Sequence, residues 1–218
     1  RIYAANAAGT YLRWDNPQTG STSSSISIAA FNSAKVSTVF VSPYTSNRVF
    51  FGTAGGRFVQ VDNAHLAAPT ATNITSASMP TGAYASCINS GTNDQNLIAC
   101  FSNYGINNIW VSTDGGTSWT AIDGDLPNIP VRWCMFEPND NTKAIIATET
   151  GVWETSLING TTTAWIPSLN FPSVRTDMLQ YRATDGTLAA GTHGRGIFTA
   201  NLPSNFVCNS PSGLASSS

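Results

Sequence analysis

Two carboxylates and a set of arginine, aromatic and polar side chains are the groups in this sequence whose chemistry suits a ligand site. Glycoside hydrolysis uses two carboxyl groups on either side of the bond that is cleaved, and Glu149 and Asp177, from successive repeats of the chain, are the only nearby pair that we can assign to this role. Arginine forks hold carboxylates, and aromatic rings and guanidinium planes stack on flat ligand faces. The same side chains also suit solvated loops or salt bridges, so both roles stay open. The binding candidates are Arg57, Tyr104, Asn107, Arg132, Arg175, His193 and Arg195.

The sequence around His193 lacks the further residues that a catalytic or metal site would need. Its one fellow histidine in the sequence is His65, and no Ser-His-Asp set or metal-ligand spacing assembles around either residue. A turn residue is therefore the favoured interpretation of His193. We expect no metal and no cofactor.

Charge and hydropathy exclude two classes of partner. The 218 residues carry a formal net charge of -2 with ten lysines and arginines, which provides no basic surface for a phosphate backbone. No apolar run is long enough to cross a bilayer. We therefore expect neither nucleic-acid binding nor membrane insertion.

The four cysteines, Cys87, Cys100, Cys134 and Cys208, lack the paired short spacings of a zinc site. Cys87 and Cys100 flank a polar turn almost symmetrically, which places them opposite each other on a hairpin and permits a cross-strand disulfide. The alternative is that both are small buried apolar residues. Cys87 and Cys134, with Met178, are assigned equivalent inner-strand positions beside Val39, and this favours the core alternative.

An internal repeat of about 45 residues organises the chain, a period typical of β-propellers. Each repeat reads as strand a, a polar turn, strand b, a glycine turn, strand c and a looser strand d, and four antiparallel strands form one propeller blade. Charged residues make up 10% of the chain against about 25% on average, and this composition suits short strands and tight turns. No helix is expected. The b–c pair recurs five times, beginning near residues 2, 49, 97, 144 and 188.

We expect an all-β fold of blades that form an incomplete, C-terminal part of a larger ring. The assigned ranges are partial blade material at 1–35, blades at 36–80, 81–130 and 131–173, strands a–c of a last blade at 174–202, and a linker at 203–218. Closed propellers hold four to eight blades, so further blades of the same parent protein are expected as partners. The segment from Cys208 to Ser217 is similar to the entry of fibronectin type III modules, which would follow the linker.

One octapeptide carries the strongest motif. Asp114 can accept hydrogen bonds from its own turn, Gly115 and Gly116 tolerate positive φ, and Trp119 can pack between strands. The segment resembles the Asp-box of bacterial neuraminidase-type repeats, which usually lies on the outer c–d turn, away from the ligand face. Its matching residues are Ser112, Asp114, Gly116, Ser118 and Trp119.

The turn from Gly191 to Phe198 likewise resembles the b–c turn in the last blade of sortilin-like and xyloglucanase-like propellers. In a propeller the d–a and b–c loops share one face, where ligands normally bind, and we expect the two carboxylates and the binding candidates named above on that face. A sialidase would require an arginine triad, a tyrosine–glutamate pair and an Arg-Ile-Pro motif, and none of these is found. Since these families share blades without sharing function, the fold alone leaves the activity open.

The leading hypothesis is a non-catalytic propeller module of a secreted or cell-surface bacterial protein. Such a module would bind a glycan or protein partner as an adhesin or scaffold. The alternative is a fragment of a secreted glycoside hydrolase of the xyloglucanase type, in which Glu149 and Asp177 would be catalytic.

Overall fold

The structure, a computed structural model, describes residues 1–20 and 22–202, which fold into five antiparallel sheets with the strands of each sheet in sequence order. The first sheet comprises β1 (Ile2–Ala5), β2 (Thr10–Trp14) and β3 (Ser23–Ser27). The second comprises β4 (Val36–Val41), β5 (Val49–Thr53), β6 (Phe58–Asp62) and β7 (Thr70–Asn73). The third comprises β8 (Ala85–Ser90), β9 (Leu97–Phe101), β10 (Ile109–Ser112) and β11 (Thr120–Ala121). The fourth comprises β12 (Val131–Glu137), β13 (Asp140–Thr148), β14 (Gly151–Thr155) and β15 (Ile166–Pro167), and the fifth β16 (Thr176–Arg182), β17 (Thr187–Thr192) and β18 (Ile197–Asn201).

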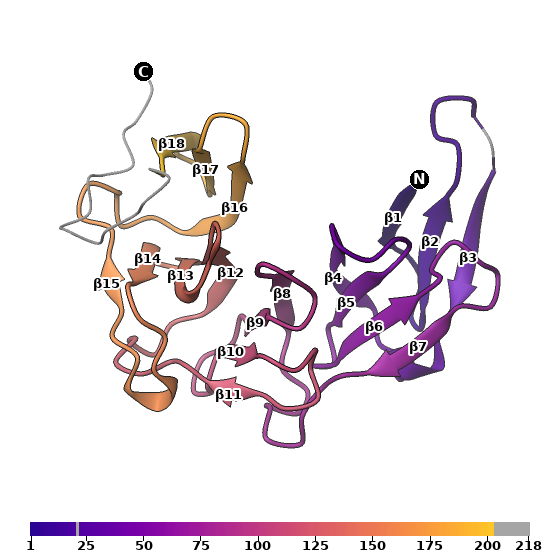
Figure 1. Ribbon diagram of the computed structural model, residues 1–218, viewed down its shortest axis with the longest axis horizontal. Helices are drawn as coiled ribbons and strands as arrows, with labels where there is room; N and C mark the ends of the chain where they lie inside the picture. The colour runs from indigo at the N-terminus through magenta and orange to yellow at the C-terminus, as the bar shows by residue number, and fades with distance from the viewer. Residues whose placement is uncertain (21, 203–218) are drawn as a thin grey trace.

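The sheets stand side by side as an open arc, with the first and last at its two ends (Figure 1). Strands β4, β8, β12 and β16 lie innermost, and each contacts the next. This arrangement confirms the predicted all-β propeller fold of four-stranded antiparallel blades, here as a partial ring. Two 3-10 helices, Ala29–Phe31 and Gly160–Thr162, were not expected. The predicted linker at 203–218 and its fibronectin-like segment lie outside the described residues. Within those residues, no helix is long and apolar enough to cross a membrane.

Apolar side chains on both faces of the middle strands fill the space between neighbouring sheets. All five residues of β5 and all five of β9 are buried, as expected for strands covered on both sides. Separate clusters join the sheets in succession, with Phe51 between the first and second, Phe101 between the second and third, Ile146 between the third and fourth, and Leu179 between the fourth and fifth. The hydrophobic core is therefore divided among the interfaces between blades.

The turn between the second and third strands of each later blade is fixed by one recurring backbone hydrogen bond. The amide of the turn donates to a carbonyl in the segment that leads into the inner strand of the same blade. These bonds are Ala54 N to Lys35 O (2.9 Å), Ser102 N to Tyr84 O (3.0 Å), Glu149 N to Pro130 O (3.3 Å) and His193 N to Arg175 O (2.8 Å). Successive blades therefore present their b–c turns and d–a connections together, on one face of the arc.

Each inner strand also carries a β-bulge at the same position. The register shifts at Ser37 in β4, Ser86 in β8, Arg132 in β12 and Asp177 in β16. The Ser37 hydroxyl donates to Ala85 O (2.6 Å), and the Ser86 hydroxyl donates to Val131 O (2.7 Å). In these two blades the bulge thus fastens one inner strand to the next.

The turn from Ser112 to Trp119 connects β10 to β11 and has the hydrogen bonds expected from its residues. The Asp114 carboxylate accepts from the Ser112 hydroxyl (2.8 Å) and from both the amide (2.9 Å) and the hydroxyl (2.6 Å) of Ser118. These bonds, the Ser118 hydroxyl first, lower the pKa of Asp114 to about 2. Gly115 donates its amide to Gln95 O in the β8–β9 turn, so this motif lies at the end of the blade opposite the b–c turns.

Trp119 fastens this turn to the preceding blade. Its indole Nε1 donates to Ile74 O at 2.7 Å, and its ring stacks on Phe58. Trp165 repeats the contact one blade later, since its Nε1 donates to Ile122 O at 2.8 Å. The tryptophan therefore recurs where the rest of the octapeptide does not.

Cys87, Cys100 and Cys134 are free thiols buried in the core. Cys87 and Cys100 are therefore small buried residues and do not form a disulfide. Cys87 and Cys100 are cross-strand partners, as the symmetrical turn indicates. The assignment of Cys87 and Met178 to the position of Val39 and Cys134 is wrong, because the chain between paired residues of the first two strands is one residue shorter in the third and fifth blades. Cys134 pairs with Ile146, as Val39 pairs with Phe51, whereas Cys87 and Met178 occupy the preceding position. Because alternate residues point to opposite faces, the three thiols meet between the third and fourth sheets.

Glu137, at the end of β12, is an exception to the apolar interior. Its side chain is only 7% exposed, and the nearest cation, Lys143 Nζ, is 3.7 Å from Oε2 and only 3.1 Å from Asp140. Burial, with smaller contributions from Asp140 and Glu154, raises the pKa of Glu137 to about 7 despite Lys143. The folded protein therefore holds this proton at a pH where the unfolded chain has released it, and stability falls as pH rises from about 4.5 through 7.

Replacing Glu137 with glutamine is expected to remove this loss of stability. At pH 8 we expect Glu137→Gln to be more stable than the wild type by about 2 kcal/mol, because glutamine needs no proton to stay neutral. At pH 5 the two proteins should unfold at similar urea concentrations. Equal free energies of unfolding at pH 8 would show that Glu137 titrates normally.

Candidate functional site

The face that carries the b–c turns and the d–a connections, here called the loop face, gathers most of the candidate residues. On the fourth and fifth blades it holds Arg132, Glu149, Arg175, Asp177 and His193, here called the charged cluster. Arg132 makes an ion pair with Glu149. Asp177 accepts from Arg175 Nε at 2.7 Å and lies 3.9 Å from His193 Nδ1. The structure therefore pairs each predicted carboxylate with one predicted arginine, and Arg175 also interacts electrostatically with Glu149 of the other pair.

The β-bulges explain why this cluster forms on these two blades. Arg132 and Asp177 occupy the bulge positions of β12 and β16, which are filled by serine in β4 and β8. A bulge re-aims the side chain that it displaces and is frequent beside active sites. In the second and third blades the bulge position holds a serine that bonds to the next blade. In the fourth and fifth blades the same position presents a charged group at the loop face.

The charged cluster is partly exposed and polar. The exposed fractions are 22% for the Glu149 side chain, 40% for Asp177 and 72% for His193. Arg132 Nε is buried without a hydrogen-bond partner among the described residues, while the hydrogen bond to Asp177 raises the pKa of Arg175. A ligand can therefore meet carboxylate acceptors and guanidinium donors side by side.

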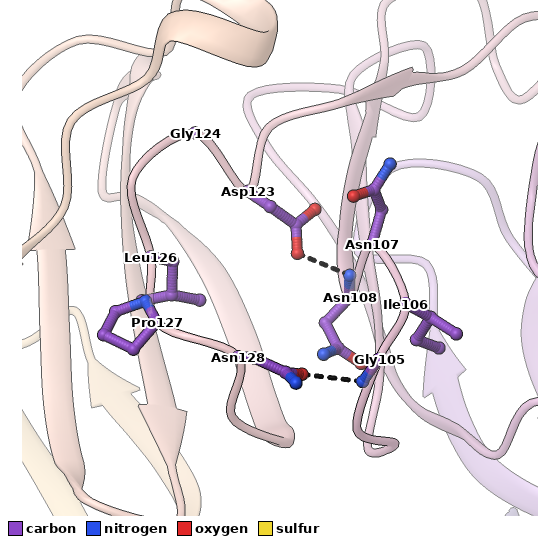
Figure 2. Close-up of a pocket in the computed structure, with 9 residues that line it drawn as sticks. All are labelled: Gly105, Ile106, Asn107, Asn108, Asp123, Gly124, Leu126, Pro127 and Asn128. Atoms are coloured by element: carbon purple, nitrogen blue, oxygen red, sulfur yellow. Dashed lines mark hydrogen bonds between the residues drawn. The ribbon is translucent and has the colours of Figure 1, made fainter.

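A pocket of about 460 Å³ adjoins the start of β12 on the same face. Figure 2 shows the β9–β10 loop and the β11–β12 connection facing each other across it, with Asp123 and Asn128 each hydrogen-bonded to the opposite loop. The Asn128 side-chain oxygen accepts from the Gly105 amide at 2.6 Å. The candidate Asn107 lines this pocket.

Asp123 and Asn108 hold the two loops of this pocket in place. The Asp123 carboxylate accepts from the amides of Asn108 (2.5 Å) and Ile109 (3.1 Å). The Asn108 side-chain amide in turn donates to Asn103 O and Ile129 O. Burial raises the pKa of Asp123 even though both backbone bonds favour its charged form. We assign both side chains to positioning, since their polar atoms are occupied within the protein.

Three other candidates lie outside the charged cluster. Arg57 is in the β5–β6 turn, where its guanidinium donates to Ala30 O at 3.1 Å, so it braces the connection between the first two blades. Tyr104 is 66% exposed on the β9–β10 loop, and Arg195 is exposed in the β17–β18 turn. These residues share the loop face but not the cluster.

Asp123, Asn108 and the role of the bulges were not predicted from the sequence. Asp123 follows the short strand β11 and resembles an ordinary turn residue, because its partners are backbone amides that no side-chain pattern reveals. The bulge positions leave a trace, namely serine in two repeats and a charged residue in two others. The repeats must be aligned in register before this trace is visible. Within residues 1–20 and 22–202, no group of histidine, cysteine, aspartate and glutamate is placed to hold a metal ion.

Comparison with known proteins finds similarity in structure alone. No protein-family model matches this sequence, and no curated protein sequence matches it. Among solved structures, a GH74 enzyme of Niastella koreensis superposes with a TM-score of 0.59 at 14% sequence identity over 90% of this chain. A protein described as an ancestral GH74 enzyme superposes with a TM-score of 0.57 at 12% identity over 76% of this chain. The chain spans only 33% and 22% of those two proteins, respectively, and at these identities the likeness is one of fold.

Proposed function

We propose that this chain is the glycan-binding part of a larger β-propeller and that the charged cluster is its contact surface. The observation that carries this proposal is the convergence of Arg132, Glu149, Arg175, Asp177 and His193 on one face. Carboxylates accept hydrogen bonds from sugar hydroxyl groups, and arginine forks donate to ring and hydroxyl oxygens or to uronate carboxylates. The neighbouring pocket, with its isoleucine, leucine and proline side chains, offers apolar surface beside these polar groups.

A specific observation also favours a second candidate, a fragment of a glycoside hydrolase. The superposed proteins are described as GH74 enzymes, and the two carboxylates of the cluster come from successive blades. Hydrolysis needs one carboxyl group as acid and another as nucleophile or base. Both Glu149 and Asp177 already pair with an arginine, and such pairing suits a binding surface at least as well as an acid catalyst. We therefore place binding first.

Arg175→Ala is expected to weaken glycan binding by roughly 10- to 100-fold, because a hydrogen bond to a charged group is lost. Ligands would be found by screening the wild type on an array of plant and host glycans, and dissociation constants measured by calorimetry. Arg182→Ala is the matched control: Arg182 also pairs with an aspartate, Asp185, but on the β16–β17 turn at the other end of the blade. Equal losses from both variants, or none, would rule out the charged cluster as the contact surface.

Turnover measurements separate the two candidates. The same glycans would be incubated with the wild type, Glu149→Gln and Asp177→Asn, and products followed by chromatography. Binding without products supports a non-catalytic module. Products that disappear in both variants would establish the hydrolase and overturn a binding-only role.

The setting of the module is part of the same proposal. We infer a secreted or cell-surface bacterial protein with further blades that complete the ring. We also infer that the Ser112–Trp119 turn is an Asp-box repeat. The low proportion of charged residues and the hydrogen-bonded Asp114 turn support this setting. The full-length gene product would test it through its signal peptide and its additional repeats.

A further inference from the structure

The face opposite the loop face contains a second hollow, of about 300 Å³, near the inner strands. Its walls are side chains from the a–b turns and inner strands of four successive blades, so the hollow exists only because these blades are assembled. Tyr44 comes from the second blade, Ser90 from the third, Glu137 and Asn139 from the fourth, and Tyr181 from the fifth. None of these residues belongs to the charged cluster.

The groups that line this hollow are rich in hydrogen-bond acceptors. Glu137 lines the hollow, and its side chain is only 7% exposed. Ser90 Oγ is buried and has no hydrogen-bond partner among the described residues. The Tyr44 hydroxyl donates to Gly91 O at 2.5 Å, so its own oxygen lone pairs remain available as acceptors. An incoming group that donates several hydrogen bonds would satisfy these atoms.

The charge around Glu137 is negative. Glu137, Asp140 and Glu154 contribute to the local potential, while Lys143 is the cation in contact, held closer to Asp140 (3.1 Å) than to Glu137 (3.7 Å). Tyr181 reaches the hollow from β16, and its neighbour Arg182 is paired with Asp185. One lysine is thus shared between two carboxylates, with Glu154 a third nearby, and a second cation would be favoured. Aromatic rings such as those of Tyr44 and Tyr181 also attract cations.

We propose that this hollow binds a primary ammonium group, such as that of an alkylamine, a lysine side chain or a peptide amino terminus. An ammonium group has three N–H donors and no acceptor, which matches the acceptors Glu137 and Ser90. The group would sit between the two tyrosines and neutralise Glu137. Retention of a buried carboxylate that lowers the stability of the fold at neutral pH is also typical of a binding site.

Calorimetric titration with n-butylammonium chloride at pH 8 tests the proposal, with n-butanol as the uncharged analogue. We expect a dissociation constant of roughly 1 mM for the amine, which is reasonable for so small a ligand, and no measurable binding of the alcohol. Protonation of Glu137 at pH 5.5 should weaken amine binding at least tenfold, because the proton and the ammonium group compete for the same carboxylate.

Variants locate the site. Glu137→Gln should weaken n-butylammonium binding at least tenfold and abolish its pH dependence. Arg175→Ala, in the charged cluster, should leave the affinity for n-butylammonium unchanged. Ser90→Ala should weaken it by a smaller factor. Amine binding that survives Glu137→Gln, or equal binding of n-butanol, would overturn the proposal. So would binding of glucose or xylose that depends on Glu137, which would make the hollow a sugar site. These outcomes are independent of glycan binding at the loop face.

Discussion

Gly124→Ala is expected to destabilise the protein by about 4 kcal/mol. A Cβ atom at this position would lie 1.7 Å from the carbonyl oxygen of Thr163, which is backbone. That carbonyl cannot withdraw easily, because it accepts the amide of Asp125, while the Asp125 carboxylate accepts the amide of Trp165. Overpacking of this kind and the positive φ of 50° both add to the cost.

Gly82 provides the matched control for this variant. It also has a positive φ, of 73°, but a Cβ atom added there would meet no other atom within 4 Å. Gly82→Ala should therefore lose only about 1 kcal/mol, the cost of the backbone conformation. Urea denaturation of both variants measures the difference. If the two alanines cost the same, the approach of the β11–β12 connection to Thr163 does not limit the packing of these blades.

Asp94→Ala is expected to lower the free energy of unfolding by about 3 kcal/mol, since it breaks a buried ion pair and its hydrogen bonds. Asp94 is 6% exposed in the β8–β9 turn and accepts from the hydroxyls of Ser42 (2.7 Å) and Thr45 (2.6 Å) and from Arg48 (3.2 Å). These three donors belong to the preceding blade. Their loss separates the second blade from the third on the a–b side.

Asp62→Ala is the control, because Asp62 pairs with the same Arg48 but is 31% exposed. It should lose less than about 1 kcal/mol, as is usual for ion pairs near the surface. Chemical denaturation of the two single variants and of the double variant would separate the contributions. A cost for Asp94→Ala as small as that of Asp62→Ala would contradict a joining role for Asp94.

The repeat could be recognised from sequence because its strongest signals are local. A run such as Val49–Thr53 is apolar along its whole length, and a glycine turn and a second strand follow it at once. A strand is apolar along its whole length when neighbouring sheets cover both of its faces. The same regularity predicted that Cys87 and Cys100 face each other, which the strand pairing confirms.

The rest of the fold depends on contacts between blades, which leave little trace in the sequence. Asp94 lies among small and polar residues and has the appearance of an ordinary turn residue, although its partners lie in the preceding blade. Cys87 and Met178 were assigned the wrong position because the chain between paired residues of the first two strands is one residue shorter in the third and fifth blades than in the second and fourth. Turn and strand patterns do not report such a difference.

The site was predictable in its members but not in its geometry. Placement of Arg132, Glu149, Arg175, Asp177 and His193 on the loop face followed from the order of strands in a blade. Their pairing, Arg132 with Glu149 and Arg175 with Asp177, depends on side-chain direction at the bulges. Glu137 was not recognised at all, because a glutamate before the Pro138–Asn139 turn suggests a solvent-exposed position.

The three thiols between the third and fourth sheets make the local opening of this interface measurable. Because each sheet packs only against its neighbours, blades can part locally without global unfolding. Cys87, Cys100 and Cys134 are at most 1% exposed, so a thiol reagent reaches them only when this one interface opens. In a Cys208→Ser variant, the rate of thiol labelling therefore reports how often the interface between the third and fourth sheets opens. A ligand that bridges the fourth blade to the third would slow that rate.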